Sequence, residues 1–170
     1  MIQAVNMLSR AKTAVLLFVV VLLSAACGSG AREIRGELPL VRFEGLELTD
    51  GEVSLAIGLG NVNDRVLVLQ DLKVRFTVED QLLIDTSTTV NIDISARGRE
   101  VVSLRAAGQA EGLNLLTERF ESTPAASTVA VAGNAAWRME LTLIDADGGE
   151  SELEAGGFLH PVPGRSRQFR

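Results

Sequence analysis

Few side chains in this chain of 170 residues could carry out acid–base or nucleophilic chemistry. The chain contains a single histidine, His160, next to Pro161 near the C-terminal end. A catalytic triad or a histidine metal site needs an imidazole that packed neighbours hold in place. We therefore expect His160 to be a solvent-exposed residue of a tail. No nucleophile–base pair is evident either, so the sequence predicts no catalytic residue, no metal site and no cofactor, in a protein that is not an enzyme.

The acidic residues Asp145, Asp147 and Glu150 are spaced somewhat like the ligands of a calcium loop. A calcium loop needs further oxygen ligands at fixed positions and a terminal bidentate glutamate. This segment instead joins two alternating apolar runs and contains Asp147-Gly148, a pair that hairpin turns favour. We interpret it as a hairpin turn.

Two asparagines, Asn61 and Asn63, interrupt an otherwise alternating stretch. Their amides could recognise a polar ligand. Asparagine side chains commonly hydrogen-bond to nearby backbone and hold turns. We therefore predict that Asn61 and Asn63 form a structural turn motif that caps the ends of neighbouring strands.

The first 26 residues have the organisation of an export signal. Arg10 and Lys12 precede an apolar run over residues 14–23, and small residues at 24–26 suit a signal peptidase. The apolar run is shorter than the ~20 residues that cross a bilayer. A cleaved signal peptide over residues 1–26 is therefore predicted.

The only cysteine, Cys27, follows this signal directly. The order Leu23-Ser24-Ala25-Ala26-Cys27 resembles the lipobox of bacterial lipoproteins, with Ser24 where leucine is usual. The resemblance implies that Cys27 becomes the acylated N-terminus of the mature chain. The alternative is ordinary cleavage after Ala26, which would leave a free thiol on an exported protein.

The charge of the chain bears on its partners. Removal of residues 1–26 takes away two basic residues and no acidic one, which changes the net charge from −6 to −8. Such a chain is repelled by phosphate backbones and by anionic lipid, so no nucleic-acid partner is expected. The acyl chains on Cys27 would then provide the link to the membrane, and several chains hold firmly where one holds weakly.

Alternation of apolar and polar residues dominates the chain after residue 37. In residues 53–78, apolar side chains recur at every second position before and after the Asn61–Asp64 turn. Because side chains alternate between the two faces of a strand, each arm is predicted to be a half-buried strand, and the two arms to form a hairpin-like pair. Similar runs predict strands over 38–48 (with a bulge at Gly45), 82–94, 102–106, 129–143 and 151–158.

One internal segment, residues 110–120, has helical spacing, because Leu113, Leu116 and Phe120 recur at intervals of three and four residues. Gly112 lowers its helix propensity, so we expect a short helix of about three turns. The apolar stripe could bind a partner, but we favour packing across one end of the sheets.

Together these elements predict a mainly β protein. Its fold would be a two-sheet antiparallel sandwich with about seven strands and one short helix. Trp137 shares a face with Met139 and Leu141 and is expected in the core. The predicted organisation is a signal peptide at 1–26, a flexible tether at 27–37, the sandwich at 38–159 and a disordered tail at 160–170.

Over residues 38–158 the order of elements resembles the LEA type 2 family (late embryogenesis abundant proteins), whose core is the WHy domain. The similarity begins with an alternating strand that runs into an Asn-Pro-Asn-like turn, here Asn61-Val62-Asn63, with Val62 in place of proline. A strand with a leucine-rich beginning follows at 67–72, then a Thr-rich strand, a short helix and a long strand that opens with Val131-Ala132-Gly133. The resemblance implies an immunoglobulin- or fibronectin-like β-sandwich with one helix. It also implies a non-catalytic role in desiccation and other stress, in bacteria often as an exported lipoprotein.

Two functions follow as hypotheses. The first is a lipid-anchored envelope protein that protects under water stress through a polar, acidic and hydrated surface. The second is an envelope binding module that docks a protein partner at a sheet edge or holds a small apolar ligand between its sheets. The residue after Cys27 is Gly28 rather than aspartate, and in bacterial lipoproteins this position directs sorting between membranes. In a diderm bacterium, the lipoprotein resemblance then implies the periplasmic face of the outer membrane.

Overall fold

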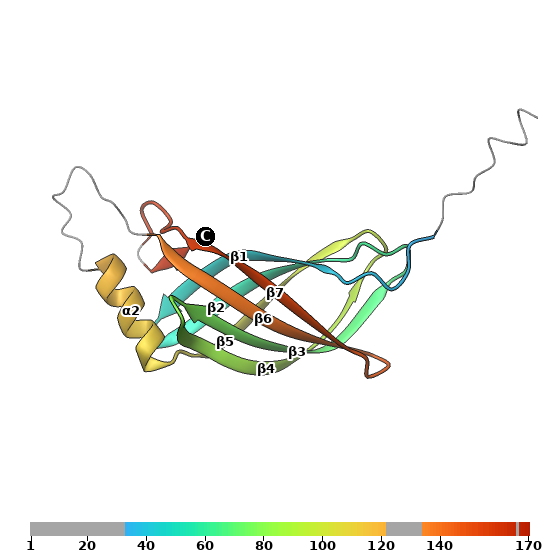
Figure 1. Ribbon diagram of the computed structural model, residues 1–170, viewed down its shortest axis with the longest axis horizontal. Coiled ribbons are helices and arrows are strands. Elements are labelled where there is room, and N and C mark those ends of the chain that lie inside the picture. The colour runs from blue at the N-terminus through green and yellow to red at the C-terminus, as the bar shows by residue number, and fades with distance from the viewer. Residues whose placement is uncertain (1–32, 122–133, 166) are drawn as a thin grey trace, which may run out of the picture. The chain divides into compact units, whose positions relative to one another are not determined.

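Two four-stranded antiparallel sheets lie face to face in the computed structural model, which describes residues 33–121, 134–165 and 167–170 (Figure 1). Sheet A has the strand order β5-β2-β1-β8, and sheet B has the order β4-β3-β6-β7. The elements are β1 (Leu40–Thr49), β2 (Glu52–Gly60), β3 (Leu67–Val78), β4 (Gln81–Ile94), β5 (Arg99–Ala107), α2 (Ala110–Glu121), β6 (Ala135–Asp145), β7 (Glu150–Leu159) and β8 (Gln168–Phe169). Within these described ranges no helix is both long and apolar enough to cross a membrane.

The core forms because apolar residues at alternating positions of both sheets point inward. On β3, Phe76 and Val78 are fully buried, whereas the intervening positions face outward. Phe76 stacks on Trp137, with 5.6 Å between the ring centroids, and Trp137 also lies 4.9 Å from Phe43. Trp137, which was expected in the core, is partly buried and packs against it. Fully burying a large apolar side chain contributes about 1.5–3 kcal/mol, so this alternation is the main driving force of the fold.

The predicted two-sheet antiparallel sandwich with one short helix is confirmed. Strand β4 pairs with β3 and lies in the sheet of β6 and β7, an arrangement found in immunoglobulin-like sandwiches. Eight strands are present among the described residues where about seven were expected, because Gln168–Phe169 add β8. The register of β1 against β2 shifts between Phe43 and Gly45, which confirms the bulge.

The hairpin-like pair predicted over residues 53–78 was wrong. Strand β2 pairs with β1 and β5 in sheet A, whereas β3 pairs with β4 and β6 in sheet B. Residues 61–66 therefore cross from one sheet to the other. The prediction failed because two half-buried strands show the same alternation whether they pair within one sheet or face each other from two sheets.

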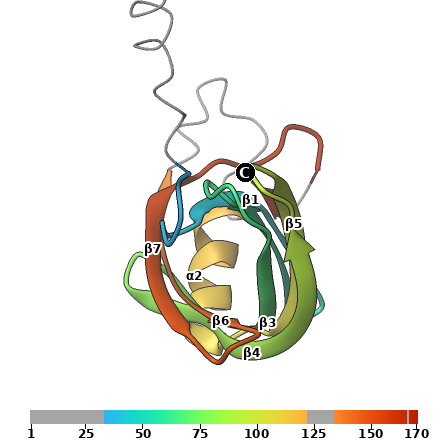
Figure 2. The same ribbon diagram turned by 90° about the vertical axis from the view of Figure 1, so that its right-hand side faces the viewer.

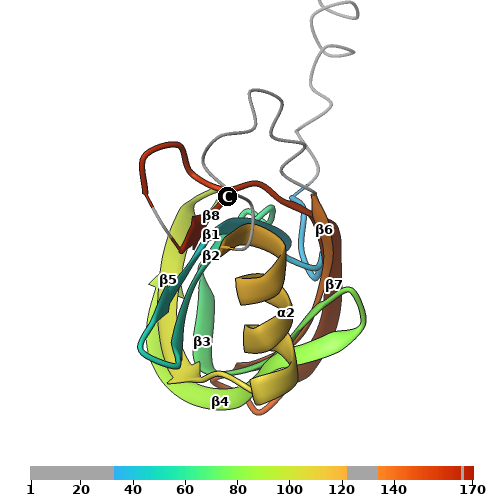
Figure 3. The same cartoon turned by 90° about the vertical axis from the view of Figure 1, so that its left-hand side faces the viewer.

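Helix α2 closes one end of the sandwich (Figure 3). Leu116 is buried, and Leu113, Leu115 and Phe120 are partly buried against the core. The apolar stripe of the helix therefore packs against the sandwich, as expected. Gly112 faces the backbone of β4, where an added Cβ would lie only 2.7 Å from the carbonyl oxygen of Leu82. Glycine at this position permits the close approach of the helix to the sheet.

The disordered tail predicted for residues 160–170 was wrong for the part of it that the structure describes. The backbones of His160 and Arg170 exchange two hydrogen bonds of 2.9 Å, and β8 pairs with β1 at Leu46 and Glu47. Phe169 is only 4% exposed, and its ring centroid lies 4.9 Å from that of Phe120. Backbone hydrogen bonds and one buried apolar side chain, Phe169, therefore hold this polar, Pro- and Arg-containing segment in place.

Candidate functional site

Asn61 is the one buried polar residue among those described, with an exposed fraction of 3%. Its side-chain nitrogen donates to the carbonyl oxygens of Arg65 at 2.6 Å, Ile94 at 3.1 Å and Ser95 at 3.1 Å. Its backbone N–H donates to the carbonyl oxygen of Gly98 at 2.9 Å. One residue therefore ties the crossover between the sheets to the end of β4 and to the turn before β5.

Asn63 binds the chain that leads into β1. Its backbone N–H donates to Asn61 Oδ1 at 2.9 Å, which is the geometry of an Asx turn. Its side chain accepts a hydrogen bond from the N–H of Glu37 at 2.9 Å and donates to the carbonyl oxygen of Glu37 at 2.8 Å. The Asn63 amide thus pairs with Glu37 as a neighbouring strand residue would.

Asp64 makes a second set of contacts to the same segment. The N–H of Ile34 donates to Asp64 Oδ2 at 2.7 Å, and the N–H of Asp64 donates to the carbonyl oxygen of Ile34 at 3.0 Å. Arg97 Nε donates to Asp64 Oδ1 at 2.8 Å. The pKa of Asp64 lies below its ordinary value, chiefly because of the Arg97 hydrogen bond and then because of the Ile34 N–H. The same contact raises the pKa of Arg97.

We refer to Asn61, Asn63 and Asp64 as the asparagine node. Its polar atoms bind the backbone of three chain segments, 34–37, 65 and 94–98, and one arginine of the turn before β5. No buried side-chain polar atom in the described ranges lacks a hydrogen-bond partner. Because the node uses its hydrogen-bonding groups internally, this geometry supports a structural role rather than ligand recognition.

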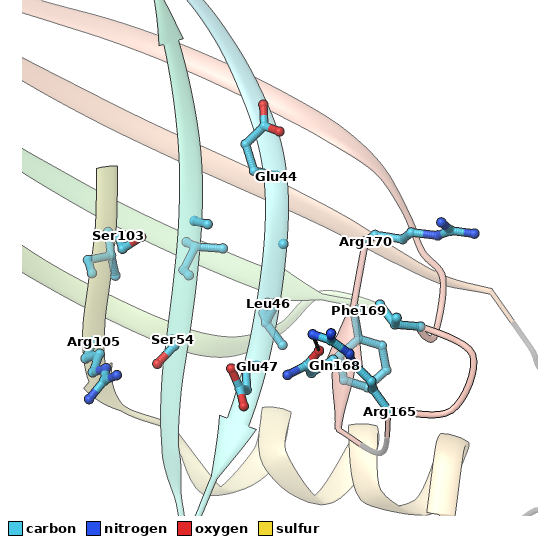
Figure 4. A pocket seen from close by; sticks show the side chains of 15 residues that line it. Glu44, Leu46, Glu47, Ser54, Ser103, Arg105, Arg165, Gln168, Phe169 and Arg170 are labelled. Carbon is cyan, nitrogen blue, oxygen red and sulfur yellow. Dashed lines mark hydrogen bonds between the residues drawn. The ribbon is translucent and has the colours of Figure 1, made fainter. Parts of the chain in front are cut away.

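A pocket of about 590 Å³ lies on sheet A beside the C-terminal segment (Figure 4). Ser54, Ala56 and Ser103 line it from β2 and β5. Arg165 and Gln168 line it from the C-terminal segment, and their side chains are joined by a hydrogen bond of 3.3 Å. The lining also includes Glu44, Glu47, Arg105 and Arg170. Charges of both signs and small hydroxyl residues lie beside apolar residues such as Leu46 and Phe169, so the lining is of mixed character.

The outward face of sheet B is polar along the middle of its four strands, whereas Val68 and Phe158 are exposed near strand ends. One row of the register joins Ser87, Lys73, Thr142 and Glu152. Ion pairs of 3.4 Å join Lys73 to Glu150 and Arg75 to Asp85. These groups are about half exposed, and such pairs contribute only about 0–1 kcal/mol, so this face is mainly a hydrated surface.

The remaining residues that the sequence singled out are not brought together. Cys27 lies outside the described residues, as do the positions 131–133 of the long strand. His160 is exposed at the end of β7. Asp145 Oδ1 accepts hydrogen bonds from the N–H groups of Asp147 and Gly149, which confirms the hairpin turn. Over the ranges that the structure covers, no group of three or more His, Cys, Asp or Glu residues could hold a metal ion.

The sequence did not reveal that Asp64 pairs with Arg97, or that the node holds Ile34 and Glu37. Asp64 lies in the predicted Asn61–Asp64 turn, and Arg97 lies between the strands predicted over 82–94 and 102–106. No spacing rule relates two turns that are 33 residues apart. The pairing follows only when the turn before β5 is known to lie beside the crossover between the sheets.

No protein-family model and no curated protein matches this sequence. Several solved structures resemble it at very low sequence identity. An Arabidopsis thaliana protein is 9% identical, with a TM-score of 0.49, and the match covers 79% of this chain and 92% of that one. A structure described as a late embryogenesis abundant protein is 9% identical, with a TM-score of 0.42, and covers 88% and 83%.

A third similar structure is OgpA from Akkermansia muciniphila, solved as a catalytically inactive form with an O-glycopeptide substrate. It is 10% identical, with a TM-score of 0.34, and the match covers 77% of this chain and 32% of that one. A fold alone does not determine a function. The function must be argued from the residues of this chain.

Proposed function

We propose that this chain is a lipid-anchored, non-catalytic envelope protein of LEA type 2 (WHy) character that protects neighbouring molecules during desiccation or related stress. Cys27 would carry the acyl chains, and the sandwich would be the protective part. The proposal draws on the lipobox-like sequence, on the resemblance of residues 38–158 to LEA type 2 proteins, and on the surface described above.

The observation that carries the proposal is the division of residues across sheet B. Inward residues such as Val74 and Leu141 are almost fully buried, while the outward residues along the middle of β3, β4 and β6 are mostly Ser, Thr, Lys, Arg, Asp and Glu. On β7 the exposed positions include Glu150, Glu152 and Glu154. A rigid sheet that presents closely spaced charges and hydroxyl groups holds water and could replace lost hydration at a drying surface.

A drying assay tests the protective part of the proposal. The purified protein should preserve the activity of a drying-sensitive enzyme better than an equal mass of albumin. A variant with Ser87→Val, Thr142→Val and Glu152→Leu removes polar groups from one row of sheet B and should protect less. Thr117→Val with Glu118→Leu, on the exposed side of α2, is the matched control and should protect as the wild type does. Protection no better than albumin would disprove this role.

Mass spectrometry of the mature N-terminus tests the anchor. Acylated Cys27 as the first residue is expected from cells that process bacterial lipoproteins, and Cys27→Ser should yield protein that no longer sediments with membranes. A mature chain that begins elsewhere, or an unmodified Cys27 thiol, would contradict the anchor while leaving the drying assay unaffected.

The pocket on sheet A favours the second candidate, a binding module. Ser54, Ser103, Arg105 and Arg165 in its lining could hydrogen-bond a small ligand, and apolar lining residues such as Val162 could contact its nonpolar part. The space between the sheets is filled by packed side chains, so an apolar ligand is not expected there. Crosslinking in intact envelopes separates the two functions, because one stoichiometric partner favours docking and none favours general protection.

A further inference from the structure

The exposed large apolar side chains of this protein are unevenly distributed. Seven are exposed in the described ranges, and five of these belong to two short segments, 34–40 and 66–68. The five, with their exposed fractions, are Ile34 38%, Leu38 53%, Leu40 66%, Val66 57% and Val68 40%. We call these five residues the apolar collar.

The collar lies at the end of the sandwich where the chain enters it. Leu40 pairs with Gly60, the last residue of β2, and Val66 immediately precedes β3. The backbone of Ile34 exchanges two hydrogen bonds with Asp64. Figure 2 views this end of the molecule directly, and α2 lies at the opposite end, as Figure 1 shows. Apolar side chains therefore surround one end of the sandwich on both sheets.

Several polar groups beside the collar are already paired within the protein. The backbone of Glu37 is hydrogen-bonded to the side chain of Asn63, and the carboxylate of Asp64 is bonded to Ile34 and Arg97. Placing a hydrogen-bonded polar group against an apolar surface costs much less than placing an unpaired one. The asparagine node thus lets this end approach a nonpolar medium without stripping water from unsatisfied backbone.

The covalent chain limits how far this end can be from Cys27. Ile34 lies seven positions after Cys27 in the sequence. Fully extended, this stretch spans at most about 25 Å. The strands of the sandwich contain 9 to 14 residues apart from β8, which corresponds to roughly 30–45 Å along the strand direction. The tether from an anchor at Cys27 is therefore shorter than the sandwich. When the strands point away from the membrane, the collar is the end near the lipid surface and α2 is the distant end.

We infer that the apolar collar rests on the surface of the bilayer that holds the acyl chains, so that the sandwich stands with α2 directed away from the membrane. This inference rests on the proposed anchor at Cys27. The occupant of the collar is zwitterionic lipid rather than anionic lipid, because the mature chain carries a net charge of −8. In addition, Asp147 lies in the turn whose Ala146 N–H donates to the carbonyl oxygen of Val68, and Glu150 follows that turn as the first residue of β7.

Site-specific quenching by lipid tests the inference. The full acylated protein is placed in phosphatidylcholine vesicles that contain a lipid with a nitroxide on its head group. A fluorophore is attached through Val66→Cys in one sample and through Phe158→Cys in the other. Phe158 is a matched control, because it is 59% exposed and lies near the end of β7, towards α2. Quenching should be severalfold stronger at position 66 than at position 158.

A second variant keeps the experiment decisive if labelling disturbs the loop. Replacing Leu38, Leu40 and Val68 by serine should lower the quenching at position 66 severalfold while the melting temperature stays close to that of the wild type. Equal quenching at positions 66 and 158, or none at either position on protein that is acylated and floats with the vesicles, would overturn the orientation and leave the anchor standing. Protein without acylation, which does not float, would overturn the proposed anchor and the orientation together.

Discussion

The two ends of the sandwich are held together by different forces. At the end where the chain enters, Asn61, Asn63 and Asp64 join loops through hydrogen bonds to backbone. At the other end, Leu116 and the Phe120–Phe169 pair close the sandwich through apolar packing. Hydrogen bonds specify one geometry, whereas apolar packing is nondirectional and depends on buried area.

This difference suits what each end has to do. Loops that cross between sheets leave backbone groups without strand partners, and a buried amide can satisfy several of them at once. A helix has its backbone hydrogen bonds satisfied internally and needs only an apolar stripe to cap the core. The next four predictions test this contrast, from the largest expected effect to the smallest.

Leu116→Ala should destabilise the protein most. Leu116 is 1% exposed, and removing a buried leucine side chain typically costs about 2–5 kcal/mol in the free energy of unfolding. Thr117→Ala, exposed on the same helix, should change that free energy by less than about 0.5 kcal/mol. Urea unfolding measures both. Similar values for the two variants would show that α2 does not close the core.

Asn61→Ala should come next, at about 1–3 kcal/mol, because it leaves the carbonyl oxygens at residues 65, 94 and 95 without their shared donor. Asn61→Asp should cost at least as much, since a carboxylate oxygen would face those carbonyl oxygens. Asn63→Ala, whose bonds to Glu37 are exposed, should cost less than Asn61→Ala. An unchanged melting temperature for Asn61→Ala would contradict the structural role of the node.

Gly112→Ala should destabilise by about 1 kcal/mol, although alanine favours an isolated helix over glycine by a similar amount. The added Cβ would lie 2.7 Å from the carbonyl oxygen of Leu82 and would push the helix from β4, and overpacking typically costs about 1–3 kcal/mol. Asn114→Ala, exposed on α2, should be neutral or slightly stabilising. A more stable Gly112→Ala protein would show that helix propensity outweighs the close approach.

The smallest effect concerns Asp64 and pH. Its pKa is lowered in the folded state from a usual value of 3.8, so its contribution to stability is present above that value and is lost as the pH falls through the lower, folded pKa. Wild type should therefore be more stable than Asp64→Asn at neutral pH, and the difference in melting temperature should shrink as the pH falls below 3.8. A difference that does not depend on pH would exclude the ion pair with Arg97 as its cause.

Much of the fold could be predicted from local patterns. Alternation identified most of the strands, the spacing of Leu113, Leu116 and Phe120 located α2, and the Asp147-Gly148 pair marked the turn between β6 and β7. These patterns are local because side-chain direction in a strand or helix depends only on backbone period. Pairing partners were harder, and the β2–β3 hairpin was wrong, since strands that face each other across a core and strands that pair in one sheet show the same alternation.

The sequence by itself determined which residues are apolar and at what period, and with them the two-sheet architecture and the short helix. Only the tertiary structure decided which turns meet, so that Asp64 reaches Arg97, Asn63 holds Glu37 and Phe169 packs on Phe120. It also showed that Gly112, which lowers helix propensity, is where the helix contacts the backbone of β4 closely. The physical reason is that periodicity is a property of neighbours in the chain, whereas these contacts join segments that the fold alone brings together.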